Sequence, residues 1–457
     1  MQKFRKLLFA RVRSESGMSL VELMVAMVIF GLVSVGILTG MLTVLKLSRD
    51  SRAVQVATNL AAEEIDLART AKDLFALDSK TYPVRVINGD KFTVKRTTDW
   101  VTDPNTVLQC GAGGAPLRYK AISVEVTWDN MSPGNAVKSY TVLNPAERIN
   151  DPTKGTIIVS VLGVVGTGIS GVSVNATPAT PAGGAVAIPV TPTPTDAKGC
   201  TYVLKVTPGN YNLTVSKTGH IDADQNVIGT ALVSVAAGSS VSRSFAYDKA
   251  STYPIAYSSN LPSAKIPTNM DTTFISSYGR YWSAATTASM SRSVALYPHP
   301  QGYEVIAGKW DKSANCPMID PASWAPVVSG TTTYAAERPA AVAAEPGTTS
   351  PTANVPMGIF KIKGDGNASR RYVKAVSQNL TPACDTTMTY TFGNVLTNSN
   401  ATDVTLALPY GNWKLYYGDA TSQTTEIATT RITLGTGQRG LLATLTNILT
   451  LDPRVAQ

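Results

Sequence analysis

The chain has 457 residues, too many for one hydrophobic core, so two to four domains are expected. Charged residues make up 16% and hydrophobic residues 44%, with abundant Gly, Pro, Thr and Val, which is typical of an extracellular β-rich protein. The net charge is +9, of which the first 17 residues supply four, and no Lys/Arg cluster is interleaved with aromatic residues. Nucleic-acid binding is therefore not indicated.

The N-terminal region predicts a membrane anchor. No residue from Leu23 to Leu45 is charged, and as a helix this stretch would span about 34 Å, enough to cross the hydrocarbon core of a bilayer. The segment before it carries five basic residues against one acid, Glu15. The positive-inside rule keeps that segment in the cytoplasm, so we expect a single-pass protein of the cytoplasmic membrane with its C-terminal bulk outside.

The junction between the basic and apolar segments is a candidate processing site. Gly17 is followed by Met18-Ser-Leu-Val-Glu22 and then by the apolar helix. This pattern resembles the class III signal of type IV prepilins and pseudopilins. The resemblance implies that prepilin peptidase cuts after Gly17 and methylates Met18. Met18 stands where phenylalanine is commoner, and Thr39 stands where many major pilins have a proline, which favours a minor pilin or a pseudopilin.

Glu22 is the candidate assembly residue. A carboxylate in an apolar helix is costly and normally has a partner. In the resembled family that partner is the N-terminal amine of a neighbouring subunit in the filament. The alternative is a glutamate that reaches water at headgroup level.

A helix is expected from Met18 to about Leu77, since the first proline is Pro83. From Ser48 it is amphipathic, and one apolar stripe should pack on a sheet. Its members are Val54, Ala57, Ala61, Ile65, Ala68 and Phe75, while acidic and basic residues, Glu63 and Glu64 among them, take most other positions.

Strands follow. Tyr82–Val86 and Lys91–Lys95 flank an Asn88-Gly89-Asp90 turn, which is a hairpin signature, and Lys120–Trp128 alternates apolar with polar residues. The helix and these strands resemble the minor-pilin branch that includes the PilV-type and GspI-type proteins. The expected fold class is α+β, with the long helix packed on a small antiparallel sheet.

The remainder predicts β-sandwich modules. Strands are expected at Thr156–Val161, Gly171–Ala176, Tyr202–Val206 and within Gly209–Val215, and their order resembles the transthyretin-like or carboxypeptidase-regulatory-like sandwich. Residues 204–215 recur at an offset of 202 as residues 406–417, which predicts a related third module. Between them, residues 331–356 should form a mobile low-complexity loop.

Five segments result. They are a leader (1–17), a membrane and filament-core helix (18–47), an amphipathic helix with the pilin sheet (48–150), a transthyretin-like sandwich (151–250), and a C-terminal β-rich module (251–457) that contains the loop 331–356.

The four cysteines predict disulfides, the default in an exported protein. Three pairings of Cys110, Cys200, Cys316 and Cys384 are possible. If pairing stays local, Cys316–Cys384 is favoured, and Cys110–Cys200 follows. No Cys/His spacing suits zinc, and no metal or cofactor is expected.

No catalytic motif is present in the sequence, so an enzyme is not expected. Asp222, Asp224 and Asn226 start like a calcium loop, but Val233 occupies the twelfth position, where a glutamate is required, so a surface turn is favoured. Five aromatic residues could form a sugar-binding or partner-binding surface, although strand spacing favours a core. They are Tyr278, Tyr281, Trp282, Tyr297 and Tyr303.

These patterns predict a minor type IV pilin-like structural subunit whose sandwich modules are presented at a filament tip. Its partners would be prepilin peptidase, the other pilins and the assembly platform of the cytoplasmic membrane. The alternatives are a filament-borne adhesin for an unidentified surface ligand, and a pseudopilin of a type II secretion or competence system.

Overall fold

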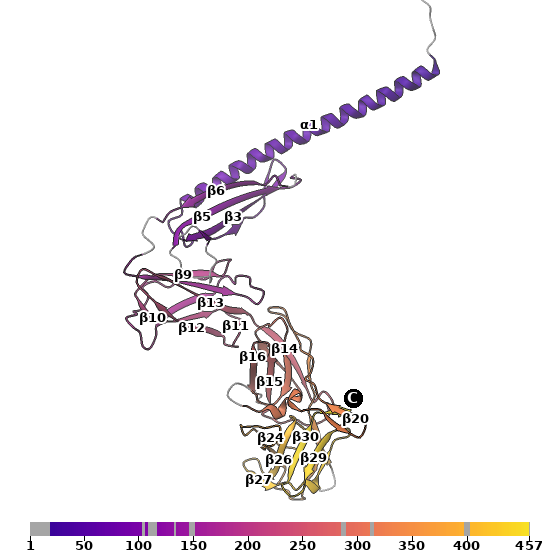
Figure 1. Cartoon of the computed structure of the whole chain (residues 1–457). Helices are drawn as coiled ribbons and strands as arrows, with labels where there is room; N and C mark the ends of the chain where they lie inside the picture. Colours follow the sequence, from indigo (N-terminus) through magenta and orange to yellow (C-terminus); the bar gives the residue numbers. More distant parts are fainter. Residues whose placement is uncertain are drawn as a thin grey trace, which may run out of the picture. The chain divides into compact units, whose positions relative to one another are not determined.

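The computed structural model describes residues 19–102, 106–107, 117–131, 134–145, 151–284, 289–310, 315–396 and 403–456. These form two compact units, whose elements are labelled in Figure 1. The first holds the described residues of 1–101 and 119–146, and the second holds those of 102–118 and 147–457. Gly17, Met18 and Cys110 lie outside the described residues.

The first unit is one long helix on an antiparallel sheet, which confirms the α+β prediction. Helix α1 (Leu20–Arg69) has 50 residues, and Figure 1 shows its C-terminal half lying across the sheet. The strands of the sheet are β1 (Lys80–Thr81), β2 (Arg85–Ile87), β3 (Asp90–Thr102), β4 (Thr106–Val107, which pairs with β3), β5 (Leu117–Trp128) and β6 (Val137–Leu143). The main order is β1-β3-β5-β6, with β2 beside β3.

The helix ends eight residues earlier than expected, at Arg69 and not at Leu77. Thr70 caps it, with its hydroxyl donating to the Leu67 carbonyl at 2.8 Å. The following chain is held by long-range contacts, because Lys120 Nζ donates to the Leu74 carbonyl at 2.6 Å and Phe75 stacks on Trp100. Phe75 therefore packs from a loop and not from the helical stripe.

The predicted hairpin and alternating strand are confirmed. Ile87 pairs with Asp90 across a two-residue turn in which Asn88 and Gly89 both have positive φ, as the type I′ turn requires. In β5 the apolar side chains are buried on one face: Ile122, Val124, Val126 and Trp128.

The second unit begins with a two-sheet sandwich around its own core. One sheet has the order β12-β10-β8 and the other the order β11-β13-β7-β9, with β13 parallel to β7. The strands are β7 (Gly155–Leu162), β8 (Ser173–Pro178), β9 (Cys200–Val206), β10 (Gly209–Ser216), β11 (His220–Asp222), β12 (Ile228–Val235) and β13 (Ser240–Lys249). The four strands expected here are all present, within a few residues.

The rest of the second unit shares one hydrophobic core that includes residues from Tyr253 to Leu451. Its first strands are β14 (Ser251–Tyr257), β15 (Asp271–Ser276), β16 (Gly279–Ala284), β17 (Ser291–Leu296), β18 (Glu304–Ala307), β19 (Val327–Ser329), β20 (Thr332–Ala335) and β21 (Ala353–Val355). The later ones are β22 (Gly358–Lys363), β23 (Tyr372–Ser377), β24 (Thr389–Asn394), β25 (Asp403–Leu408), β26 (Gly411–Gly418), β27 (Gln423–Glu426), β28 (Ile432–Leu434), β29 (Arg439–Ala443), β30 (Ile448–Asp452) and β31 (Val455–Ala456). Three short 3₁₀ turns are η1 (Pro317–Ile319), η2 (Pro321–Ser323) and η3 (Thr429–Arg431).

The internal repeat is a repeat of structure as well as of sequence. β10 and β26 both have eight residues and start 202 positions apart, each with a glycine at positive φ. The fully buried Tyr211 hydroxyl donates to the Thr207 carbonyl at 2.8 Å, and the fully buried Trp413 indole donates to the Pro409 carbonyl at 3.0 Å. Each aromatic residue thus closes the turn four residues before it.

Residues 331–356 consist of a loop, 336–352, between two short strands. They contain β20 and β21, and β21 pairs in parallel with β14. Arg338 makes two hydrogen bonds to the buried carboxylate of Asp320, at 2.9 and 2.8 Å, and a third to Glu304 at 2.8 Å. A low-complexity composition does not report on such long-range partners, and the expected mobility of the loop stays a prediction.

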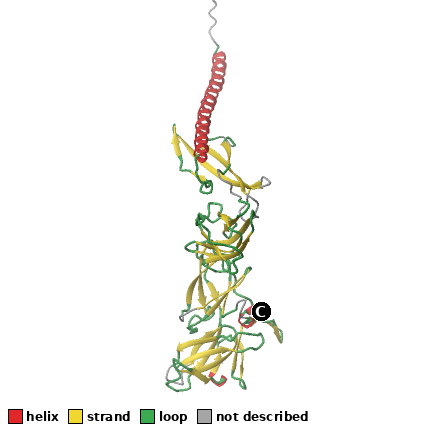
Figure 2. Ribbon diagram, turned by 90° about the vertical axis from the view of Figure 1, so that its left-hand side faces the viewer, coloured by secondary structure: helices red, strands yellow, loops and turns green. Residues whose placement is uncertain are grey.

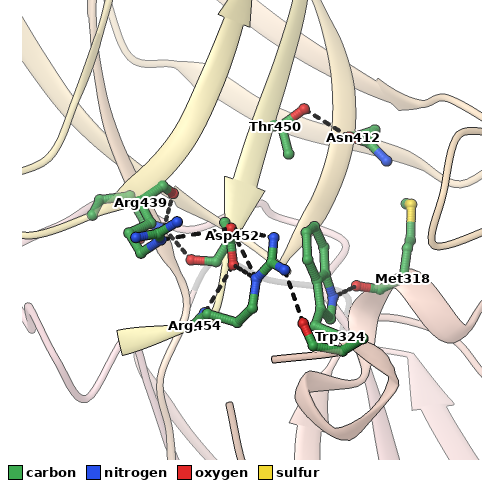
Figure 3. A network of polar contacts seen from close by, with 9 residues as sticks. Met318, Trp324, Asn412, Arg439, Thr450, Asp452 and Arg454 are labelled. Carbon is green, nitrogen blue, oxygen red and sulfur yellow. Dashed lines mark hydrogen bonds and ion pairs between the residues drawn. The ribbon is translucent and has the colours of Figure 1, made fainter. Parts of the chain in front are cut away.

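Asp452 secures the chain near its C-terminus. Figure 3 shows its carboxylate beside Arg454 and Arg439. Arg454 Nη2 lies 2.7 Å from Asp452 Oδ2, and Arg454 Nη1 donates to the Ala325 carbonyl at 2.9 Å. The Trp324 indole in turn donates to the Met318 carbonyl at 2.8 Å. The chain end is thereby tied to the η1 and η2 turns.

The favoured disulfide Cys316–Cys384 is present and closes a separation of 68 residues. No cysteine in the described part of the chain is free, and Cys200 is disulfide-bonded. Because Cys110 lies outside the described residues, Cys110–Cys200 stays a prediction.

We expect the aromatic corner of the first sandwich to be testable by substitution. Tyr211→Phe should lower the free energy of opening of β10 by about 1–2 kcal/mol, because the Thr207 carbonyl loses its donor, and Tyr211→Ala should lower it by about 3–5 kcal/mol. Hydrogen exchange of the β10 amides, read by mass spectrometry on the full chain, measures this. Tyr278→Phe, at an exposed position of the same unit, is the control and should stay within about 0.5 kcal/mol. Equal protection in all variants would contradict the assigned role of the corner.

Candidate functional site: the N-terminal helix

Helix α1 has two halves with opposite surroundings. Every residue from Ser19 to Arg49 is exposed, including the whole uncharged stretch. From Ala53 onward one face is buried against the sheet, with Ala57 and Ala68 fully enclosed. Figure 2 shows the helix continuing past the strands of its unit. The exposed apolar surface of this half of α1 is large enough to need a partner, either lipid or protein.

By length and composition, α1 is a helix that could span a membrane. The most apolar 18-residue segment of α1 has no buried residue. The uncharged residues, the missing internal cover and the position near the N-terminus agree with the anchor that the sequence predicts.

Glu22 lies in the first turn of α1 and has a local partner. The Ser19 backbone N–H donates to Glu22 Oε2 at 3.1 Å, and the Ser19 hydroxyl accepts from the Val21 N–H at 3.3 Å. This is a capping box, which satisfies N–H groups that have no partner inside the helix. The Ser19-x-x-Glu22 spacing is the sequence signature of this cap, which neither the intermolecular nor the headgroup interpretation of Glu22 includes.

The predicted stripe is mostly confirmed in the sheet-packed half. Ala57, Ala61, Ile65 and Ala68 are buried against the sheet, whereas Val54 is 37% exposed. Small alanines at the contact let the helix backbone approach the strands closely. The helix is therefore fixed on the sheet along most of the expected face.

Glu64 was expected on the polar face and is instead buried. It forms an ion pair with Arg96 of β3 at 2.6 Å and accepts a hydrogen bond from the Tyr82 hydroxyl at 2.7 Å. Arg96 also donates to the Asp78 carbonyl at 3.0 and 2.9 Å, so both charges are satisfied. Burial, as the largest cause, and the hydrogen bond to Glu64 raise the pKa of Tyr82. No periodicity in the helix alone could reveal a partner that lies on a strand.

A second ion pair lies where the helix leaves the sheet. Arg49 contacts the Asp90 carboxylate at the β2–β3 hairpin. The Asp90 side chain is nearly buried, whereas that of Arg49 is 60% exposed. This pair marks the boundary between the packed and the unpacked halves of α1.

The other sequence candidates lie in the second unit. Asp222 accepts hydrogen bonds from the Asn226 backbone at 2.7 Å and from its side chain at 3.2 Å, so these residues form the surface turn that the sequence favours. Within the described residues, no cluster of three or more His, Cys, Asp or Glu side chains suits a metal ion.

The five aromatic residues divide between core and surface. Tyr297 and Tyr303 are buried, as the core interpretation expects, and burial raises the pKa of Tyr297 to about 12. Tyr278 is 67% exposed, and Tyr281 and Trp282 are half-buried.

Comparison with known families supports the N-terminal assignment. Residues 12–38 match the model of the prokaryotic N-terminal methylation motif. This segment contains Gly17, Met18, Glu22 and the first part of the apolar helix. The match covers only this part of the chain, and no curated protein matches the sequence.

Solved structures give weak overall likenesses. The Bacillus anthracis TIE protein is 11% identical with a TM-score of 0.19, covering 81% of this chain and 74% of that one. A streptococcal ancillary pilin is 10% identical with a TM-score of 0.19, covering 58% and 81%. BcpA, the major pilin subunit of Bacillus cereus, is 10% identical with a TM-score of 0.18, covering 60% and 92%. With TM-scores so far below 0.5, we infer nothing from them.

The buried ion pair generates a prediction with a control at the adjacent position. Glu64→Ala should destabilise the first unit by about 3–5 kcal/mol, because Arg96 would remain buried without its counter-charge. Glu63→Ala removes only an exposed pair with Arg85, at 3.0 Å, and should cost no more than about 1 kcal/mol. Hydrogen exchange of the β3 amides in the detergent-solubilised full chain measures the destabilisation in both variants. Equal effects of the two substitutions would show that the Glu64–Arg96 pair does not secure the helix.

Proposed function

With the N-terminal segment of a type IV pilin-like protein as the premise, we propose that this chain is a minor pilin-like structural subunit of a surface filament. The observation that carries the proposal is the exposed apolar half of α1, attached directly to the methylation motif. Such a helix can be stored in the bilayer and later transferred into a bundle of equivalent helices. Both surroundings keep its apolar surface out of water.

The proposal names three partners. Prepilin peptidase would cleave after Gly17 and methylate Met18, other pilins would surround the apolar half of α1, and the assembly platform in the cytoplasmic membrane would drive the transfer. The protein acts through assembly and not through catalysis.

The size of the appended β modules favours a place at the filament tip. Residues 151–457 form modules that far exceed the helix and its sheet in mass, and many copies of them along a shaft would obstruct helix packing. A subunit present once, at the end, avoids that obstruction. A pseudopilin of a secretion or competence system is the second candidate, since Thr39, which stands where many major pilins carry a proline, suits a pseudopilin as well as a minor pilin.

Processing is the first test. Mass spectrometry of the mature protein should show a chain that starts at N-methylated Met18. Gly17→Val should block cleavage, whereas Gly31→Val, at a helix position with no neighbouring atom within 4 Å of an added Cβ, should leave it intact. A mature chain that begins after residue 45 would contradict the pilin assignment.

Assembly is the second test, and the capping box allows charge to be separated from helix capping. Glu22→Ala removes the charge and the Glu22 contact of the capping box, Glu22→Gln keeps the capping geometry without charge, and Ser19→Ala weakens the cap by about 1 kcal/mol but keeps the charge. If Glu22 neutralises a buried amine, both Glu22 variants should be nearly absent from sheared filaments, because an unpaired buried charge costs about 3–5 kcal/mol. Ser19→Ala should assemble.

The measured quantity is the ratio of this protein in sheared filaments to that in membranes, by immunoblot, in cells that produce all other pilins. Near-normal assembly of Glu22→Gln would show that hydrogen bonding suffices. Normal assembly and cleavage of Glu22→Ala would reduce Glu22 to a headgroup residue and remove the central argument for its role. Immunogold label at filament ends would support the tip position, and label only in membranes would favour a pseudopilin.

A further inference from the structure

A pocket of about 300 Å³ lies in the second unit, where the turn after β11 meets the β15–β16 hairpin. Its aromatic lining consists of Tyr278, Tyr281, Trp282, His299 and Tyr303. This volume is at the lower end of the range of small-molecule sites, and a concave aromatic lining with a few polar groups is their usual composition. Nothing in the assembly function described above uses this pocket.

The floor of the pocket is held in place by hydrogen bonds. Gln225 Nε2 donates to the Tyr303 hydroxyl at 2.9 Å, and the Tyr297 backbone N–H donates to Gln225 Oε1 at 2.9 Å. The Tyr303 hydroxyl donates onward to the Tyr297 carbonyl at 2.7 Å. Gln225 is therefore fixed at both ends of its amide. A preformed floor avoids the ordering cost that weakens binding to flexible surfaces.

The wall offers aromatic surface to a ligand. Tyr278 lies in the two-residue turn of the β15–β16 hairpin and is 67% exposed, although its ring stacks on the buried His299 with centroids 5.2 Å apart. Stacking fixes the orientation of the tyrosine ring, while its exposure leaves ring surface accessible. An aromatic ring that is exposed and yet held in one orientation suits the apolar face of a flat ring-shaped ligand.

The polar groups of the pocket balance in charge. Asp224 and Arg280 both line it, one acid and one base, and both are exposed. The Arg280 guanidinium is stacked over the Trp310 ring, 4.0 Å from its centroid, which orients its N–H groups. Burial lowers the pKa of His299, so its imidazole adds no charge at neutral pH. The planar Arg280 guanidinium donates hydrogen bonds and the planar Asp224 carboxylate accepts them. Together they suit a ligand with adjacent hydroxyl groups better than a ligand with a net charge.

We propose that this pocket binds a neutral saccharide, one ring of which stacks on Tyr278 while its hydroxyl groups bond to Asp224 and Arg280. The volume admits about one or two sugar rings. The proposal rests on the proposed function in one respect, since a filament subunit displays this unit outside the cell. It would make the chain a filament-borne adhesin as well as a structural part.

The test uses the detergent-solubilised full chain on an array of immobilised neutral mono- and oligosaccharides, with sialylated and sulfated glycans as charged comparators. Titration with the methyl glycoside of the best neutral ligand then gives the dissociation constant. Tyr278→Ala should weaken binding at least tenfold. Tyr140→Ala is the matched control, since Tyr140 is 70% exposed in the first unit, far from the pocket in sequence, and should leave binding unchanged.

Several results would overturn the proposal. They are no binding to any neutral saccharide, binding that Tyr278→Ala leaves intact, and a preference for charged glycans. Protection of the edge strand β16 by an extended peptide, with no saccharide bound, would also overturn it. Unchanged hydrogen exchange of the β15 amides in Tyr278→Ala excludes misfolding as the cause of lost binding.

Filament assembly is scored separately, so that the two proposals fail independently. Tyr278→Ala should enter sheared filaments as the wild type does. Normal assembly without saccharide binding rejects the saccharide site alone. Saccharide binding by a chain that is neither cleaved nor assembled keeps the site and rejects the pilin-like function.

Discussion

The exposed apolar half of α1 imposes the constraint on which the rest of this protein depends. About 30 residues of helix have no cover within their own chain, and water is an unfavourable surrounding for them. The sheet-packed half must therefore hold the helix firmly, whatever surrounds the other half. The buried stripe of alanines and the Glu64–Arg96 pair supply that attachment, the first by close packing and the second by fixing which face meets the sheet.

A buried ion pair is not by itself a source of large stability, since desolvation offsets most of the attraction. Its value here is that misplacing the helix would leave two charges unpaired in the interior. Tyr82 and the Asp78 carbonyl satisfy the remaining hydrogen-bonding groups of Glu64 and Arg96. The arrangement thus penalises any other docking of α1 more than it rewards this one.

The second unit uses one local device twice. Tyr211 and Trp413 each close a turn through a hydrogen bond to the carbonyl four residues earlier, and each is fully buried. The sheets around them differ, since β10 lies in a three-stranded sheet and β26 in a six-stranded one, although both strands pair antiparallel with their neighbours. A recurring local corner can evidently serve sheets of different composition, because its hydrogen bond is made within one short segment.

The sequence by itself determined the features that depend on neighbouring residues. The uncharged run from Leu23 to Leu45, the Asn88-Gly89 hairpin, the alternation in Lys120–Trp128 and the 202-residue repeat all follow from local spacing, and the structure bears them out. Only the tertiary structure decided where α1 ends, that Glu64 is buried, that Arg338 ties residues 331–356 to Asp320, and that Gln225 meets Tyr303. In each case the deciding partner lies far away in the chain. Local periodicity reports which face of an element is apolar, whereas burial of a charge or formation of a pocket depends on what the fold brings against that face.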